Sequence, residues 1–177
     1  MKDEILAAYH RIAPLVRQTP LEHSAELGAY LKLEHLQHTG SFKFRGAANR
    51  IGLLTPRQAA AGVVTASNGN HGLGVAAAAQ GRGIAAEVFV SSHVSPAKAA
   101  RIEARGARIH CAGDDPLTAE LAARRAASSA VKGSSPAQCM RAPIASMRRT
   151  LAAETWEETK TSAAMPRACD AAATPKP

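Results

Sequence analysis

The sequence predicts an α/β protein with an open, mainly parallel sheet and helices on both faces, a three-layer αβα arrangement. Three observations predict this fold class. Short apolar runs alternate with stretches of helical periodicity up to about residue 127. Glycines follow helical stretches at Gly81 and Gly106, where helices are expected to end. Three strand-to-helix units in succession require parallel strands that are covered on both faces and joined by right-handed crossovers.

The elements follow from these patterns in chain order. The apolar runs predict strands at Tyr30–Leu33, Gly62–Ala66, Ala85–Val90 and Ala107–Cys111. The helical patterns predict helices at Met1–Val16, Ser41–Leu54, Asn70–Gln80, Ser95–Arg105 and Pro116–Ala127. One face of the first helix is expected to carry its apolar side chains, Ile5, Leu6, Tyr9 and Ile12. Ser41 is expected to cap the second helix, and Pro96 suits the first turn of the fourth.

Residue usage changes along the chain and predicts a domain boundary near residue 127. Of the Val, Ile, Leu and Phe residues, 28 lie in residues 1–122 and only three in the 55 residues that follow. Because large apolar side chains must offset roughly 1–2 kcal/mol of backbone entropy per ordered residue, the second part cannot build a core of its own. We therefore expect a folded unit over residues 1–127 and a disordered tail, rich in Ala, Ser and Arg, over residues 128–177.

The formal net charge of +8 does not predict a nucleic-acid-binding face. Residues 1–122 carry 13 basic and 10 acidic side chains, a net charge of +3, whereas residues 123–177 carry 9 and 4, a net charge of +5. Most of the excess thus lies after residue 122, in the last third of the chain, which we expect to contact nucleic acid only nonspecifically. With no apolar window long enough to span a membrane and no export signal, the cytoplasm is the expected compartment. The three cysteines show no zinc-site spacing.

Two segments place unusual residues where a strand gives way to a helix, the position at which open α/β sheets bind ligands. In the first segment, Lys43 follows the expected cap and is flanked by Phe42 and Phe44. A lysine so placed is most often a solvated side chain. The two phenylalanines favour another interpretation, in which apolar surface desolvates the amine and lowers its pKa toward a nucleophilic range.

The second segment, residues 65–74, combines small polar residues with glycines at a helix start. Such a start offers backbone N–H groups and side-chain amides to an anion, although a tight turn with an asparagine cap explains the pattern at least as well. The glycine order, Gly69-x-x-Gly72-x-Gly74, is not that of the dinucleotide fingerprint. Nucleotide binding is therefore not indicated.

Taken together, the segments resemble a known family. The motif Lys-Leu-Glu-x-x-Gln-x-Thr-Gly-Ser-Phe-Lys-x-Arg-Gly-Ala occupies residues 32–47, and Ser-x-Gly-Asn-His-Gly occupies residues 67–72. Both resemble the pyridoxal-phosphate enzymes of the tryptophan-synthase-β fold type (fold type II), specifically the threonine/serine dehydratases. Ser95-Pro96-x-Lys98 and the Gly106-Ala107 turn extend the likeness from about residue 5 to residue 127.

The resemblance implies a cofactor, pyridoxal 5'-phosphate, and roles for five residues. Lys43 would hold the cofactor as a Schiff base and move the α-proton of the bound amino acid. Phe42 would pack against the pyridine ring, and Asn70 would hydrogen-bond its 3-hydroxyl. Ser67, Asn70 and His71 would surround the substrate carboxylate. For Gln37 and Arg45 we expect only a strand-end hydrogen bond and a helix-surface cation, and we predict no metal site, although His35, His38 and Glu34 lie close in sequence.

The implied reaction is a lyase reaction of amino-acid metabolism: threonine or serine, between which the sequence does not decide, would give a 2-oxo acid and ammonia. Family members that racemise serine have a serine just before this glycine, whereas Asn68 stands here, and an amide is a poor proton carrier. Elimination is therefore favoured over racemisation. The family forms homo-oligomers, which the resemblance allows here as well.

The family's fold has a second, larger domain with a glycine-rich loop for the cofactor phosphate. No run of glycines occurs in these 177 residues, and only Gly133 follows Gly113. The expected fold is therefore incomplete relative to the two-domain family, and a truncated or frame-shifted copy with little activity is the favoured hypothesis. Two alternatives stay open: a non-catalytic βα remnant, and a β-replacement enzyme resembling the cysteine synthases.

Overall fold

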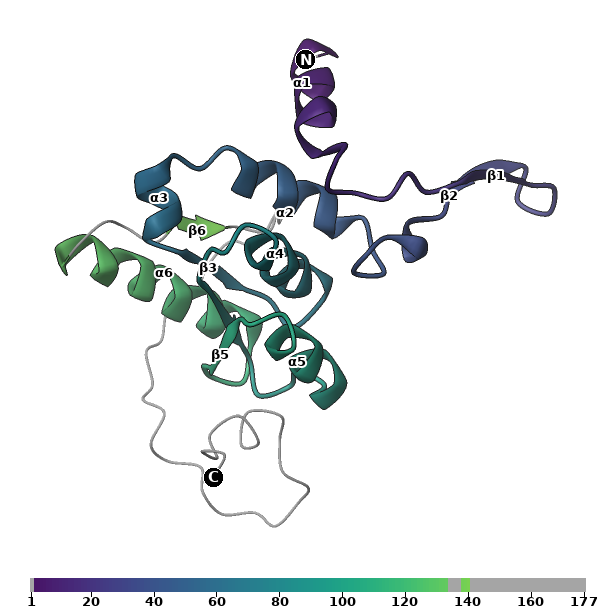
Figure 1. Cartoon of the computed structure of the whole chain (residues 1–177). Coiled ribbons are helices and arrows are strands. Elements are labelled where there is room, and N and C mark those ends of the chain that lie inside the picture. Colours follow the sequence, from purple (N-terminus) through teal and green to yellow (C-terminus); the bar gives the residue numbers. More distant parts are fainter. Residues whose placement is uncertain (1, 134–137, 141–177) are drawn as a thin grey trace.

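A four-stranded parallel sheet forms the centre of the computed structural model, which describes residues 2–133 and 138–140 (Figure 1). Its strand order is β5-β4-β3-β6. The strands are β3 (Val63–Ala66), β4 (Ala86–Val90), β5 (Arg108–Cys111) and β6 (Gln138–Met140). Each neighbouring pair is parallel, with Val63 opposite Ala86 and Val88 opposite Ile109. The chain builds outward from β3 to β5 and then returns to the other side of β3, so the strand order reverses beside β3.

Helices cover both faces of this sheet, which confirms the predicted fold class. Helices α4 (Asn70–Gln80) and α5 (Pro96–Glu103) lie on one face, and α6 (Pro116–Gly133) lies on the other (Figure 1). Val63 and Val64 are neighbours in β3 but enter different cores, as the alternation of side chains along a strand requires. Val63 joins the larger core with α4 and α5, and Val64 packs with Phe89 and the alanines of α6.

Helix α2 (Lys43–Gly52) packs against α4 rather than directly on the sheet. Its buried side chains recur at helical spacing and make one apolar stripe: Phe44, Ala47, Ala48 and Ile51. A short helix, α3 (Pro56–Ala60), follows it, and the sequence analysis did not predict it. The signal was present, because Thr55 and Gln58 form a capping box and Pro56 stands between them in the first turn of the helix.

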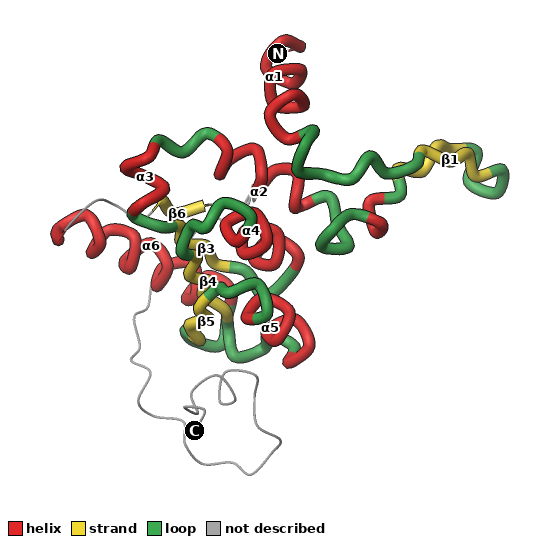
Figure 2. The backbone as a smooth tube through the Cα atoms, viewed as in Figure 1, coloured by secondary structure: helices red, strands yellow, loops and turns green. Residues whose placement is uncertain are grey.

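The strand predicted at residues 30–33 exists but belongs to a separate structure. Strand β2 (Ala29–Lys32) pairs with β1 (Leu21–Ser24) as an antiparallel hairpin outside the parallel sheet. Figure 2 shows the hairpin reaching away from the body of the molecule. All residues of β2 are exposed, so the expectation that the strand at residues 30–33 belongs to the parallel sheet is wrong. Gly28, at a φ of +57°, makes the hairpin turn.

The first helix, α1 (Lys2–Ile12), also stands apart from the sheet (Figure 1). Ile12 is its one buried residue, whereas Ile5, Leu6 and Tyr9 are exposed. The apolar face predicted from the sequence is therefore present but covered only at its carboxyl end. A hydrogen bond from Arg11 to the side-chain carbonyl of Asn49 ties that end to α2.

The boundary expected at residue 127 falls inside α6, which continues to Gly133. Strand β6 then adds residues of the expected tail to the sheet beside β3. Residues 134–137 and 141–177, the rest of that tail, lie outside the described residues. Among the helices described, none is long and apolar enough to cross a bilayer.

The hairpin and α1 together leave several large apolar side chains exposed, among them Ile5, Tyr9, Leu21, Leu27 and Tyr30. An exposed apolar area of this kind binds hydrophobic dyes and promotes self-association. We expect the protein to enhance the fluorescence of such a dye and to associate with itself in light scattering.

The double variant Leu27→Gln/Tyr30→Gln should lower both signals. The matched control is Leu53→Gln, which removes one exposed leucine that follows α2 and should change little. A monodisperse monomer that binds no dye would contradict this expectation.

Candidate functional site

The segment before Lys43 is a turn in which buried and exposed residues alternate. The N–H of Gly40 donates to the carbonyl of Gln37 at 2.8 Å, and Gly40 has a φ of +75°, which favours glycine. Thr39 and Ser41 are buried, and within the described chain neither hydroxyl has a hydrogen-bond partner. Phe42, not Ser41, stands at the N-cap of α2 and makes no side-chain cap. The predicted capping role of Ser41 is thus wrong, and two hydroxyls beside the lysine are left available.

Lys43 is the first residue of α2 and is half-buried. Its Nζ lies 4.8 Å from the ring centroid of Phe42, a cation–π contact. The two phenylalanines do not flank the amine equally. Phe44 turns into the core and meets His38 edge to face at 5.7 Å, whereas Phe42 is 58% exposed. Phe42 is therefore the apolar partner of the lysine.

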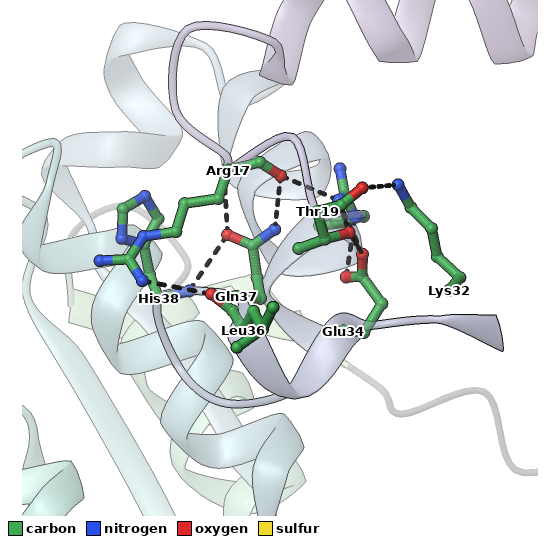
Figure 3. A network of polar contacts seen from close by, with 8 residues as sticks. Arg17, Thr19, Lys32, Glu34, Leu36, Gln37 and His38 are labelled. Carbon is green, nitrogen blue, oxygen red and sulfur yellow. Dashed lines mark hydrogen bonds and ion pairs between the residues drawn. The ribbon is translucent and has the colours of Figure 1, made fainter. Parts of the chain in front are cut away.

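A polar network fixes the position of this segment (Figure 3). The Arg45 guanidinium donates to both oxygens of the Glu34 carboxylate, at 2.9 Å from Nε and 2.8 Å from Nη2. The same Nη2 donates to the carbonyl of Arg17 at 3.0 Å. Thr19 adds a hydroxyl that donates to Glu34, and the ammonium of Lys32 donates to the Thr19 carbonyl. Arg45, two residues after Lys43, thereby anchors the start of α2 to residues 17–19 and 34.

Electrostatics support the same pairing. The hydrogen bond from Arg45 lowers the pKa of Glu34 below its ordinary value, while partial burial acts in the opposite direction. The hydrogen bond to Glu34 in turn raises the pKa of Arg45. The expectation that Arg45 is a helix-surface cation is therefore wrong, because its side chain is paired and mostly buried.

Gln37 makes the second part of this network. Its side-chain carbonyl accepts from the N–H of Arg17 at 2.9 Å, and its amide donates to the Arg17 carbonyl at 3.0 Å. The sequence analysis expected a strand-end hydrogen bond for Gln37. The structure shows instead that its side chain joins two loops. A buried amide that pairs both ways with the backbone of one residue holds the chain as a strand partner would.

The second segment lies at the carboxyl end of β3, beside the point where the strand order reverses. The N–H of Ser67 donates to the Phe89 carbonyl at 2.9 Å and extends the ladder, while the Ser67 hydroxyl accepts from the N–H of Gly69 at 3.1 Å. Gly69 is the N-cap of α4 and supplies no side-chain cap. The first turn of this 11-residue helix, which begins with Asn70 and His71, therefore presents its positive end at the carboxyl edge of the sheet.

Helix packing brings the two segments together. A Cβ added at Gly74 would lie 3.2 Å from the carbonyl carbon and oxygen of Lys43 and from the nitrogen of Phe44. Gly74 is one turn after Asn70, so the amino-terminal turns of α2 and α4 lie side by side. The prediction that Lys43 follows a strand of the parallel sheet is wrong, because the strand before it belongs to the hairpin. Contact between helix backbones, and not a shared sheet edge, places the lysine.

The structure thus gathers Phe42 and Lys43 on α2 and Ser67, Asn70 and His71 around the start of α4. Sequence reasoning missed Thr19 and Ser91, which support these segments and carry no local sequence signal. It also missed Arg101 of α5, whose guanidinium donates to the Thr39 carbonyl at 3.1 Å. Within the described residues, no three His, Cys, Asp or Glu side chains are grouped so as to hold a metal ion.

Comparison with known proteins adds a family to this geometry. Residues 12–172 match the family described as pyridoxal-phosphate dependent enzyme. Among curated proteins, the catabolic L-threonine dehydratase TdcB of Staphylococcus aureus (strain USA300) is 41% identical over 113 residues, which make up 60% of this chain and 33% of the relative. This chain therefore spans about a third of the length of the curated relatives it matches.

Solved structures share the fold. Maize serine racemase superposes with a TM-score of 0.72 at 33% identity, over 81% of this chain and 44% of that one. The threonine deaminase of T.th. gives 0.64 at 37% identity, over 73% and 42% of the two chains. The processed threonine deaminase isoform 2 of Solanum lycopersicum gives 0.68 at 26% identity, over 80% and 43%.

The ion pair between Arg45 and Glu34 predicts an acid-sensitive stability. Because the pKa of Glu34 is lowered in the folded state, its contribution is complete above the ordinary glutamate pKa of about 4.3 and is lost as the pH falls through the folded value. Glu34→Gln should cost about 1–2 kcal/mol in urea unfolding at pH 7, since it weakens a charge-assisted pair of bonds. The difference from the wild type should shrink below about pH 4.

The matched control is Glu120→Gln, which removes an i,i+4 ion pair with Arg124 on the surface of α6. Such pairs contribute about 0.3–0.5 kcal/mol. Equal losses from the two substitutions would contradict the anchoring role of Glu34.

The close approach at Gly74 predicts a second effect. Gly74→Ala should destabilise the protein by about 1–3 kcal/mol, because the added methyl group meets backbone atoms that cannot rotate away. Gly46→Ala is the control: it is also within a helix, nothing lies within 4 Å of its added Cβ, and it should be neutral or stabilise by about 0.5–1 kcal/mol. Urea unfolding measures both. A Gly74→Ala protein as stable as Gly46→Ala would show that α2 and α4 do not touch there.

Proposed function

This chain belongs to the pyridoxal-phosphate-dependent enzymes of fold type II, and from that premise we propose that it carries the lysine half of an ammonia-lyase site for threonine or serine. The observation that carries the proposal is the side-by-side packing of two helix starts. One bears Lys43, and the other bears Asn70 and His71. An amine that condenses with an aldehyde and a cluster of donors for a carboxylate are the two groups such a site needs.

The residues at the lysine end fit pyridoxal phosphate. Lys43 presents an amine against the Phe42 ring, and Phe42 is exposed enough to stack on an aromatic cofactor. The buried hydroxyls of Thr39 and Ser41, without partners in the described chain, offer further hydrogen bonds close by. The phosphate end lacks the corresponding residues, because the 177 residues contain no glycine-rich run to cradle a doubly charged group.

The proposed mechanism assigns three tasks to the chain. When bound, pyridoxal phosphate withdraws electrons from the α-carbon of the amino acid and so acidifies its proton. Ser67, Asn70 and His71, at the positive end of α4, orient the substrate carboxylate. Asn70 would hydrogen-bond the 3-hydroxyl of the cofactor, and Lys43 Nζ would accept the α-proton. Departure of the β-hydroxyl with a proton, as water, and hydrolysis of the released imine by a second water would then give a 2-oxo acid and ammonia.

Elimination is the reaction best supported by the relatives, since curated and structural neighbours include a threonine dehydratase and a threonine deaminase. Racemisation is the second candidate, favoured by the superposition on maize serine racemase.

An adduct without turnover is the expected behaviour of the 177-residue chain by itself. The reason is electrostatic: the loss of one well-placed stabilising contact commonly costs about 100-fold in rate, and the phosphate has no evident anchor.

Adduct formation tests the proposal directly. Wild-type protein mixed with pyridoxal 5'-phosphate should develop the visible absorption of a lysine imine, and borohydride reduction followed by peptide mass spectrometry should find the label on Lys43. Lys43→Ala should abolish this label. Lys98→Ala, which removes an exposed lysine of α5, should leave it unchanged.

Labelling spread evenly over exposed lysines would contradict the proposed site. The Lys43→Ala protein also sets the baseline for oxo-acid release from threonine and serine. Lys43-dependent release well above that baseline would overturn the expectation of an adduct without turnover, and would mean that residues outside those described supply the phosphate site.

A further inference from the structure

Asn68 stands between two residues assigned to the site, yet its side chain is engaged elsewhere. Its side-chain carbonyl accepts from the N–H of Ser91 at 2.8 Å, and its amide nitrogen donates to the Ser91 hydroxyl at 2.5 Å. Ser91 follows β4 directly and is fully buried. Both hydrogen-bonding groups of the amide are thus bound to one residue of the neighbouring strand end.

This contact takes the place of a backbone bond. Ser67 continues the β3–β4 ladder by donating to Phe89, and a regular parallel ladder would next join the N–H of Ser91 to the carbonyl of Ser67. The N–H of Ser91 instead donates to the Asn68 side chain. The hydrogen-bonded ladder between β3 and β4 therefore ends at the side chain of Asn68. The backbone carbonyl of Ser67 is left out of the ladder.

The released carbonyl of Ser67 turns toward α4. A Cβ at Gly72 would lie 2.9 Å from that carbonyl oxygen and 3.0 Å from Cγ1 of Val88. The turn is therefore packed from one side by the first turn of α4 and held from the other side by Asn68. Its shape decides where the hydroxyl of Ser67 and the first N–H groups of α4 point.

We propose that Asn68 is a positioning residue whose amide, bound to Ser91, fixes the turn Ser67–Asn70 in the shape that presents the donors of α4 to a carboxylate. This role deepens the proposed function and rests on it for the identity of the ligand. The side chain needs no contact with substrate. Its commitment to Ser91 also keeps it from carrying a proton to the α-carbon, which favours elimination over racemisation.

Amide hydrogen exchange, followed by NMR on the 177-residue chain without cofactor, tests the role. In Asn68→Ala, the amides of Ser91 and Gly69 should exchange at least about fivefold faster, because the Ser91 N–H loses its acceptor and the Gly69 N–H is bonded within the turn that Asn68 holds. Amides of Val75 and Val88 should keep their wild-type rates. A general loss of stability would instead accelerate all of these amides together.

Two further variants complete the experiment. Asn68→Asp should retain slow exchange, because a carboxylate accepts from the Ser91 N–H and from its hydroxyl in the same geometry. Ser92→Ala is the matched control, since the hydroxyl of Ser92 donates to Asp114 and not to Asn68. It should leave the exchange rate of the Gly69 amide unchanged.

Local acceleration in Asn68→Ala with protection in Asn68→Asp supports the proposal. Unchanged exchange at Ser91 and Gly69, or uniform acceleration, overturns it. The lysine adduct is scored separately: its absence from the wild type would contradict the proposed function, whereas the exchange rates alone decide whether Asn68 positions the turn.

Discussion

The contact between the backbones of α2 and α4 at Gly74 is the constraint on which the site depends, because it brings a lysine from one part of the chain beside a polar helix start from another. Such proximity requires a helix without large side chains on the facing surface. Helix α4 meets this requirement: residues 72–79 are all buried and consist of glycines, alanines, one leucine and one valine. The small side chains of these glycines and alanines permit the two helices to approach.

The polar residues of the first motif have a structural task that is separate from chemistry. The side chains of Gln37 and Arg45 both hydrogen-bond the backbone of Arg17 (Figure 3). Glu34 accepts hydrogen bonds from Arg45 and from the hydroxyl of Thr19. Together these bonds fix the entry into α2. A partly buried charged pair adds less to stability than its Coulomb energy suggests, because desolvation opposes it. The pair between Arg45 and Glu34 instead restricts the orientation of the two segments, because a bidentate guanidinium–carboxylate contact tolerates few orientations.

The two polar loops are held in different ways, and the difference matters for function. The lysine loop is anchored to the N-terminal segment outside the sheet, whereas the Ser67–Asn70 turn is anchored within the sheet through Asn68 and Ser91. The lysine side of the site can therefore shift relative to the carboxylate side only by breaking the α2–α4 contact. A site built from two such parts depends on helix packing for its alignment more than on any single hydrogen bond.

The βα alternation from residue 62 to residue 127, and the family to which the chain belongs, could both be predicted from the amino-acid sequence. This was possible because strand and helix periodicities are local, and because motifs that contact a cofactor are contiguous. The sequence could not place β2, since an apolar run of four residues looks the same in a buried sheet and in an exposed hairpin. Nor could it assign Arg45 or Asn68, whose partners Glu34 and Ser91 lie 11 and 23 residues away. Only the tertiary structure decides which distant group meets a polar side chain, because burial leaves that side chain no water to bond with instead.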